Sequence, residues 1–237
     1  MTAAVLLIQH MEDGREDRVA SHLSRRGFAL DWRNPARGDA LPEDGADYAG
    51  VVVYGGIQSV NDAPRDTWIR VELQWIRRWV LDGGAYLGLC LGGQLLARSL
   101  GAEVGPHPDG LHEIGFVPVA PTDAGEDVFP GPLHVYQWHN EGFTVPDGGE
   151  LLARGEVYPN QAFRVGDRAF GLQFHPEATA HMRGEWLDAS AHMLDSPGAH
   201  PRSRQESDAR CFDEPMEDWL LALIDDHVLP TDEPRGS

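Results

Sequence analysis

The segment Tyr86-Leu87-Gly88-Leu89-Cys90-Leu91-Gly92-Gly93-Gln94-Leu95-Leu96-Ala97 places a cysteine between two apolar runs. Residues 85–89 are expected to form a buried strand, and residues 91–100, which stop at Gly101, a helix. Glycines two residues before and after Cys90 suit a sharp strand-to-helix turn, where a side chain would collide with neighbouring backbone. Such a turn exposes the cysteine at the sheet edge, and the positive end of the following helix favours its thiolate. The segment therefore predicts a nucleophile.

Upstream of this turn, apolar runs alternate with amphipathic ones. Residues 67–81 carry apolar side chains at spacings of four, three and four, as one face of a helix requires. A β-branched run that ends in Gly55-Gly56 predicts a central strand. The expected elements are strands at 4–8, 28–32 and 50–54, and helices at 15–26 and 67–81. This alternation indicates a parallel sheet covered on both faces.

The second half of the chain is richer in expected strands, which Pro, Gly and Asp turns separate. The expected elements there are strands at 113–119, 133–138, 161–165 and 169–174, and helices at 178–194 and 216–227 around a polar loop at 196–208. We see no repeat and no linker that would separate domains. We therefore expect one α/β domain over residues 1–237: a three-layer sandwich around a mostly parallel central sheet, with a strand-rich second half.

Composition argues against several classes of function. The 38 acidic residues outnumber the 19 basic ones, all of which are Arg, so that the net charge is −19. Such a surface repels phosphate backbones and anionic lipids, and we expect neither nucleic-acid nor membrane binding. Two cysteines do not make a disulfide framework, the N-terminus lacks a basic leader, and no apolar run approaches about 20 residues. These features predict a soluble cytoplasmic protein.

A second informative segment is Phe170-Gly171-Leu172-Gln173-Phe174-His175-Pro176-Glu177, in which a buried strand leads into a histidine and a carboxylate. A base at a strand end, oriented by an acid that fixes its tautomer, is what a cysteine nucleophile needs. The alternative for Cys90 alone is a small buried apolar residue, the usual state of an intracellular cysteine. The spacing of His175 and Glu177 does not itself establish contact with Cys90.

Together these segments resemble the class I glutamine amidotransferases, whose Gly-x-Cys-x-Gly-x-Gln turn and Phe-His-Pro-Glu segment supply a Cys-His-Glu triad. The resemblance extends over residues 48–186. Residues 53–56 with 59–62 are similar to the family's oxyanion loop, and residues 160–164 to its penultimate strand region. The resemblance implies a flavodoxin-like fold. It is strongest with the small stand-alone proteins related to the glutaminase part of GMP synthetase.

The resemblance assigns roles to individual residues. It implies that Cys90, His175 and Glu177 are catalytic. Backbone amides of Gly56 and Leu91 are the candidates for stabilising the oxyanion. The substrate-binding candidates are Gly55, Gln94, Trp138, His139 and Asn140. For His139, a packed and hydrogen-bonded histidine is an equal alternative, and for Gln94 the alternative is a solvated helix residue. The chain departs from many relatives at Ile57, where they have Pro.

The expected reaction is hydrolysis of the γ-amide of glutamine or of a γ-glutamyl compound through a γ-glutamyl thioester, without a cofactor or metal. His107 and His112 are expected to be surface histidines. The ammonia could pass to a separate synthetase, because the chain has no Lys for a phosphate-binding loop. Alternatively, the protein acts alone on a γ-glutamyl conjugate. A third possibility is a non-catalytic partner-binding or regulatory subunit with the same fold.

Overall fold

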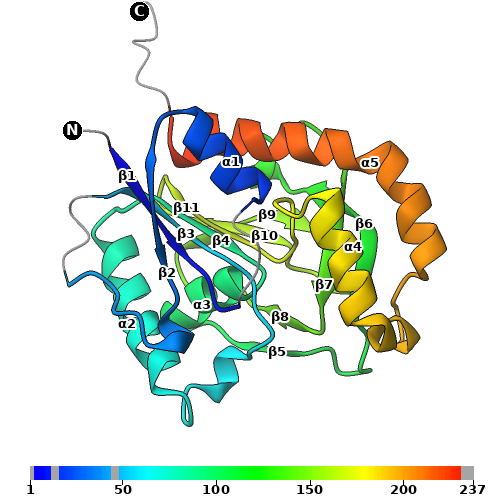
Figure 1. Cartoon of the computed structure of the whole chain (residues 1–237), viewed down its shortest axis with the longest axis horizontal. Coiled ribbons are helices and arrows are strands. Elements are labelled where there is room, and N and C mark those ends of the chain that lie inside the picture. The colour runs from blue at the N-terminus through cyan, green and yellow to red at the C-terminus, as the bar shows by residue number, and fades with distance from the viewer. Residues whose placement is uncertain (1–2, 12–15, 44–47, 231–237) are drawn as a thin grey trace, which may run out of the picture.

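The computed structural model describes residues 3–11, 16–43 and 48–230, and a large mixed sheet runs through its centre (Figure 1). Within these residues the sheet has nine strands in the order β2-β1-β3-β4-β11-β10-β9-β6-β7. Their bounds are β1 (Ala4–Ile8), β2 (Ala29–Arg33), β3 (Tyr48–Val53), β4 (Tyr86–Leu89), β6 (Glu113–Pro121), β7 (Leu133–His139), β9 (Gly149–Arg154), β10 (Ala162–Val165) and β11 (Ala169–Leu172). A separate antiparallel pair joins β5 (Val104–Pro106) to β8 (Glu141–Phe143).

The sheet changes character at β11. The strands β2, β1, β3, β4 and β11 are all parallel to their neighbours, whereas β10, β9, β6 and β7 follow as antiparallel neighbours. The carboxyl ends of β1, β3, β4 and β11 therefore meet at one edge of the sheet, where parallel α/β folds commonly place their sites. The predicted α/β class with a strand-rich second half is confirmed.

The helices are α1 (Arg18–Arg25), α2 (Thr67–Leu81), α3 (Leu91–Ser99), α4 (Ala180–Ala189) and α5 (Arg202–Leu223). Short 3-10 turns lie at Pro35–Arg37, Val60–Asp62, Asp123–Gly125 and Ala191–Asp195, and a π turn at Ile224–Val228 follows α5. No helix of the described ranges is long and apolar enough to cross a membrane.

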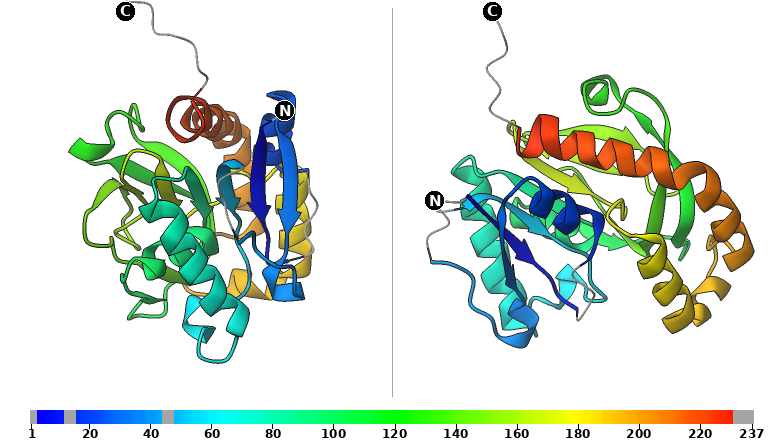
Figure 2. Two further views of the ribbon diagram at one scale, coloured as in Figure 1. Left: turned by 90° about the vertical axis from the view of Figure 1, so that its left-hand side faces the viewer. Right: turned by 45° about the horizontal axis from the view of Figure 1, so that its top comes forward.

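Alternation along the strands sends side chains into two separate cores. In β1, Val5 and Leu7 join one buried cluster, whereas Leu6 and Ile8 join the other. The first cluster includes α1 and α5 residues, the second α2 and α3 residues. Figures 1 and 2 show the corresponding layers, with α1 beside α5 on one face of the sheet and α2 on the other. The predicted three-layer sandwich is confirmed.

Most expected elements are present with small shifts, and the helix at 67–81 has the predicted bounds. The expected start of the first helix, at residue 15, lies outside the described residues. The loop expected at 196–208 is wrong, because α5 begins at Arg202 and continues through Pro215. Its polar first half turns few side chains inward, so it lacks an apolar helical pattern, and charge pairs such as Arg202–Glu206 support it. The strand β9 and the pair β5–β8 were not predicted.

One carboxylate links three helices near the sheet edge. Asp213 of α5 accepts hydrogen bonds from Arg18 of α1 and from Arg183 of α4, each at 2.7 Å. Both arginines are buried, and each also donates to a backbone carbonyl, of Pro176 and Ala178 respectively. Although partial burial opposes the effect, hydrogen bonds from the two arginines hold the pKa of Asp213 below its usual 3.8.

We predict that Asp213→Ala lowers the free energy of unfolding by about 2–4 kcal/mol, because two buried guanidinium groups lose their shared partner. Since the folded pKa lies below the unfolded one, the stabilisation is present above about pH 3.8 and lost as pH falls through the folded value. Denaturant unfolding of the full chain measures both effects. Glu206→Ala is the control on the same helix: it breaks an exposed pair and should cost under about 0.5 kcal/mol. Equal losses in the two variants would contradict the prediction.

Candidate active site

Cys90 stands at the junction of β4 and α3 in a strained backbone conformation. Its φ of 50° is the one positive φ of a non-glycine residue in the described part of the chain. Its amide donates to the Leu172 carbonyl of β11 at 2.9 Å, and its carbonyl accepts from the Gln94 amide within the first turn of α3. Strain of this kind costs on the order of 1–3 kcal/mol and persists only where surrounding structure enforces it.

The three glycines around Cys90 supply that enforcement. A Cβ on Gly92 would lie 2.0 Å from the Val53 carbonyl oxygen, and one on Gly93 would lie 2.5 Å from that of Leu172. A Cβ on Gly88 would lie 2.5 Å from the Gly92 carbonyl. The first turn of α3 therefore presses against the ends of β3 and β11, a packing available only without side chains at these positions. The glycine pattern of the sequence has this physical cause.

His175 and Glu177 meet as an ion pair directly after β11. His175 Nδ1 lies 2.7 Å from Glu177 Oε1, and both side chains are buried. The His175 amide donates to the Tyr136 carbonyl, which ties this turn to β7. Arg18 fixes the other side, because its amide donates to the Glu177 carbonyl. Both β7 and α1 thus set the direction of the imidazole.

The structure brings this pair beside Cys90. A Cβ added to Gly55 would lie 2.6 Å from His175 Cε1 and 3.6 Å from Cys90 Cβ, so both residues border the same glycine. Burial works against a charged imidazole, but the Glu177 carboxylate and a side-chain hydrogen bond with Cys90 raise the pKa of His175 well above 6.5. With Nδ1 on the carboxylate, Nε2 is the nitrogen left to face the sulfur.

The loop after β3 lies against the first residue of α3. A Cβ on Gly56 would approach Leu91 Cδ2 at 2.9 Å and His10 Cβ at 3.1 Å, which brings both candidate oxyanion residues to one place. His10 is buried, stacks on Trp68, and lies 3.0 Å from Glu72 Oε1 of α2. Burial opposes its charge, but Glu72 raises the pKa of His10. This ionic support under the loop was not predicted, because its members are 62 residues apart.

The predicted substrate residues lie at different depths. Gln94 is buried, and its Nε2 donates to the Glu141 carbonyl at 3.0 Å. His139 is buried too: its Nε2 lies 3.0 Å from Glu113 Oε2, and its Nδ1 lies 3.0 Å from the same Glu141 carbonyl. Asn140 is exposed. Both ring nitrogens of His139 therefore already have acceptors, as the packed alternative requires, while the roles of these residues in binding stay predictions.

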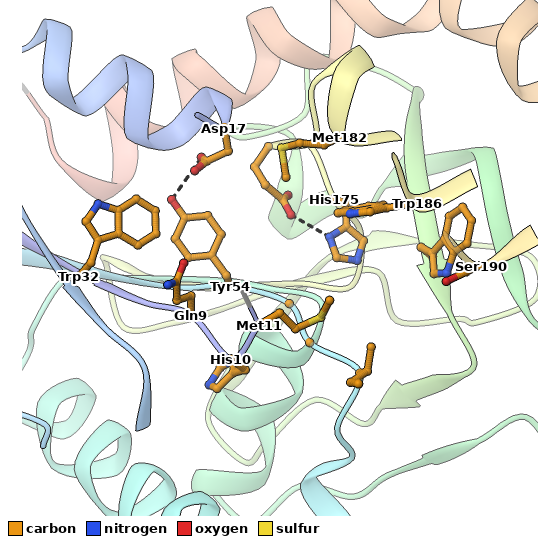
Figure 3. A pocket seen from close by; sticks show the side chains of 15 residues that line it. Gln9, His10, Met11, Asp17, Trp32, Tyr54, His175, Met182, Trp186 and Ser190 are labelled. Carbon is orange, nitrogen blue, oxygen red and sulfur yellow. Dashed lines mark hydrogen bonds and ion pairs between the residues drawn. The ribbon is translucent and has the colours of Figure 1, made fainter. Parts of the chain in front are cut away.

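A cavity of about 110 Å³ lies beside His175 (Figure 3). Aromatic and thioether side chains line much of it, and they come from β2, the residue after β3, β7 and α4: Trp32, Tyr54, Trp138, Met182 and Trp186. The Trp186 ring meets the His175 ring edge-on, with centroids 4.9 Å apart. Trp138, predicted as a substrate residue, thus lies on the wall of this cavity.

A further polar residue, Asp17, lines the cavity, and sequence reasoning missed it. Asp17 caps α1 by accepting from the Ala20 amide, and it also accepts a hydrogen bond from the Tyr54 hydroxyl at 3.2 Å. Burial and the nearby Glu177 raise the pKa of Asp17 to about 6. The local signal was an aspartate before a helix, which predicts a cap and says nothing about a neighbour 160 residues away.

The histidines outside this site do not form a metal centre within the described ranges. Among those residues, no three His, Cys, Asp or Glu side chains converge in a way that could hold a metal ion. His107 Nδ1 instead accepts from the Asp109 amide at 3.1 Å, in a local turn.

Comparison with known proteins relates the chain to glutamine amidotransferases. Residues 11–190 match the family described as glutamine amidotransferase class-I. The chain is 34% identical over 162 residues to the glutamine amidotransferase-like protein YfeJ of Salmonella typhimurium. The matched region covers 65% of this chain and 67% of that protein. It is 36% identical over 166 residues to a glutamine-hydrolyzing GMP synthase of Aeropyrum pernix, covering 68% of this chain and 30% of that protein.

Solved structures agree with the fold over nearly the full length. A glutamine amidotransferase from Methylobacillus flagellatus superposes with a TM-score of 0.87 at 27% identity, covering 93% of this chain and 92% of the other. A glutamine amidotransferase from Thermotoga maritima gives a TM-score of 0.84 at 28% identity, covering 95% and 97%. The similarity therefore includes both the parallel and the antiparallel parts of the sheet.

We predict that Gly92→Ala destabilises the protein by about 3 kcal/mol or more, because the new methyl group would overlap the Val53 carbonyl. Thermal and denaturant unfolding measure the loss. Gly184→Ala in α4 is the matched control, since a Cβ there meets nothing within 4 Å and Ala favours a helix over Gly. An unchanged midpoint for Gly92→Ala would show that the junction can relax and that its glycines are not required by close packing.

Proposed function

This chain belongs to the glutamine amidotransferase class-I family, and on that premise we propose that it hydrolyses the γ-amide of glutamine or a γ-glutamyl compound through a thioester on Cys90. One observation carries the proposal: the His175 imidazole lies between the Glu177 carboxylate and Cys90, beside a glycine loop that faces α3. A nucleophile, a base and an orienting acid are the three parts that such catalysis requires.

Acylation begins with attack of the Cys90 sulfur on the amide carbonyl carbon. The raised pKa of His175 favours the protonated imidazole beside the sulfur, and a cationic neighbour of this kind activates a cysteine for attack. As the C–S bond forms, charge on the carbonyl oxygen would be stabilised by the amides of Gly56 and Leu91, each worth roughly 3 kcal/mol. His175 then gives its proton to the leaving nitrogen as the C–N bond breaks.

Deacylation uses the same groups in reverse. Neutral His175 takes a proton from water, the water oxygen attacks the thioester carbonyl, and the C–S bond breaks to release glutamate. Glu177 holds the imidazole in the required tautomer and stabilises its charged form in both steps. The strained backbone of Cys90 fixes this residue at the junction of β4 and α3, where its side chain is buried beside His175.

The use of the ammonia is a further part of the proposal. The chain spans less than a third of the GMP synthases that it matches, so the remainder of those proteins has no counterpart in this chain. A separate ammonia-accepting synthetase is one destination that these relatives suggest. Action on a γ-glutamyl conjugate without any partner is the other, and the cavity beside His175 favours it for the reasons developed below.

We predict that Cys90→Ala lowers γ-glutamyl hydrolysis by at least about 10³-fold while the fold is kept, because no other group at the junction can form the thioester. Glutamate release measures the activity, and peptide mass measurement after treatment with a glutamine-like electrophile locates the adduct. Cys211→Ala is the matched control, since this second free cysteine is exposed on α5. Full activity in Cys90→Ala, or an adduct only on Cys211, would end the proposal.

The pH dependence tests the role of Glu177. Removing the carboxylate in Glu177→Gln takes away the leading interaction that raises the pKa of His175, so this pKa falls. The alkaline limb of kcat/KM should therefore move to lower pH, and the maximum should drop by about 10²–10⁴-fold as the tautomer is lost. Rate measurements from about pH 5 to 10 decide the matter. An alkaline limb that does not move would assign Glu177 a structural role only.

A further inference from the structure

The cavity beside His175 meets the predicted site at Gly55, Gly56 and Trp138 and extends from there along Trp32, Met182 and Trp186. Gln94 and Asn140, two of the residues expected at the amino-acid end of the substrate, do not line it, and neither does Cys90. His175, Gly55 and Gly56 do. The part of the cavity along Trp32, Met182 and Trp186 is therefore bordered by residues other than those expected at the amino-acid end of the substrate.

The direction of proton transfer decides what the cavity faces. During acylation, the carbonyl oxygen turns toward Gly56 and Leu91, and the acyl chain toward Gln94. The leaving nitrogen must accept its proton from His175 and therefore lies on the imidazole side. Any group carried on that nitrogen consequently extends past His175 into the cavity, and free glutamine, whose leaving group is ammonia, would leave it empty.

The lining of the cavity suits an apolar group. Trp32, Tyr54, Trp138 and Trp186 present aromatic surface, and Ile57 at the rim is 85% exposed, unusually so for a large apolar side chain. The carboxylates of Asp17 and Glu177 are only 1% and 2% exposed and are bonded to Tyr54 and His175, so they offer little surface to a cation. A cavity of about 150 Å³ holds a benzene ring, and this open one of about 110 Å³ is of similar size.

We propose that the substrates are γ-glutamyl amides whose nitrogen bears a small apolar or aromatic group, and that the cavity beside His175 binds this group. This inference rests on the proposed function. In the reaction, the amide C–N bond breaks, His175 protonates the departing nitrogen to give a primary amine, and water cleaves the thioester to give glutamate. The protein is then a hydrolase that acts without an ammonia-accepting partner.

A series of secondary amides tests this on the wild-type chain. γ-Glutamyl-methylamide is the reference, because its amide reactivity matches that of the pentylamide and the benzylamide. We expect kcat/KM to rise at least about tenfold from the methylamide to either larger substrate, through burial of the added apolar surface. The 4-aminobutylamide, equal in length to the pentylamide but cationic, should fall below it. Glutamate release is the readout for all four and for glutamine.

A pair of variants connects the preference to the cavity. Trp32→Ala removes one wall without touching His175 and should reduce the ratio of kcat/KM for benzylamide over methylamide at least about threefold. Trp79→Ala is the matched control: this tryptophan is also half-buried, but it lies on α2, where its Nε1 donates to the Ala85 carbonyl, and the ratio should not change. Thermal unfolding verifies that both variants fold.

The possible outcomes separate this inference from the proposed function. If glutamine or the methylamide is hydrolysed but kcat/KM does not rise with the larger amides, the apolar pocket is overturned and the proposed hydrolysis by Cys90 stands. Preference for the 4-aminobutylamide also overturns it, in favour of a cation site. Absence of hydrolysis and of any Cys90 adduct with every compound overturns the proposed function itself. The inference is supported if kcat/KM rises with the larger apolar amides, Trp32→Ala removes this rise, and Trp79→Ala keeps it.

Discussion

Close contact between backbones at the end of β4 determines the arrangement of the whole site. The first turn of α3 lies so near the ends of β3 and β11 that Gly88, Gly92 and Gly93 have no room for a Cβ. This contact holds Cys90 at a positive φ. It also fixes the distance between α3 and the strand that leads to His175. A methyl group at one of these positions would separate layers that the active site needs together.

Charges buried around this junction act as supports. The His175–Glu177 pair is held from β7 through Tyr136 and from α1 through Arg18, which is in turn fixed by Asp213 of α5. On the other side, His10 and Glu72 lie under the loop that contains Gly56. Burial of isolated charges would be unfavourable, but each of these groups has a close partner of opposite charge or a backbone partner. The result is an imidazole whose charged form is favoured within a mostly apolar surrounding.

The surroundings of His175 differ between the side toward α3 and the side toward α4. Toward α3, the side expected to hold the glutamyl group is polar, with Gln94 and His139 both hydrogen-bonded to the Glu141 carbonyl. Toward α4, the walls are aromatic and open. If, as we infer, the substrates carry an apolar group on the leaving nitrogen, this cavity is where that group would lie.

Local patterns in the sequence were sufficient to predict the strand-to-helix turn at Cys90, the parallel half of the sheet and the candidate reactive groups. The glycines around Cys90 reflect sterics that act within a few residues, and the spacing in residues 67–81 reflects the geometry of one helix. The sequence thereby determined the α/β class, the strand-to-helix turn and the identity of the candidate reactive groups. Only the tertiary structure decided which distant residues meet: Asp17 with Tyr54, His10 with Glu72, Asp213 with two arginines, and aromatic residues of β2, β7, α4 and the loop after β3 around one cavity. These contacts depend on how separate elements pack, and no local pattern predicts them. The helix α5 was missed for a related reason: its polar first half has no apolar periodicity, because residues far away in the chain hold it in place.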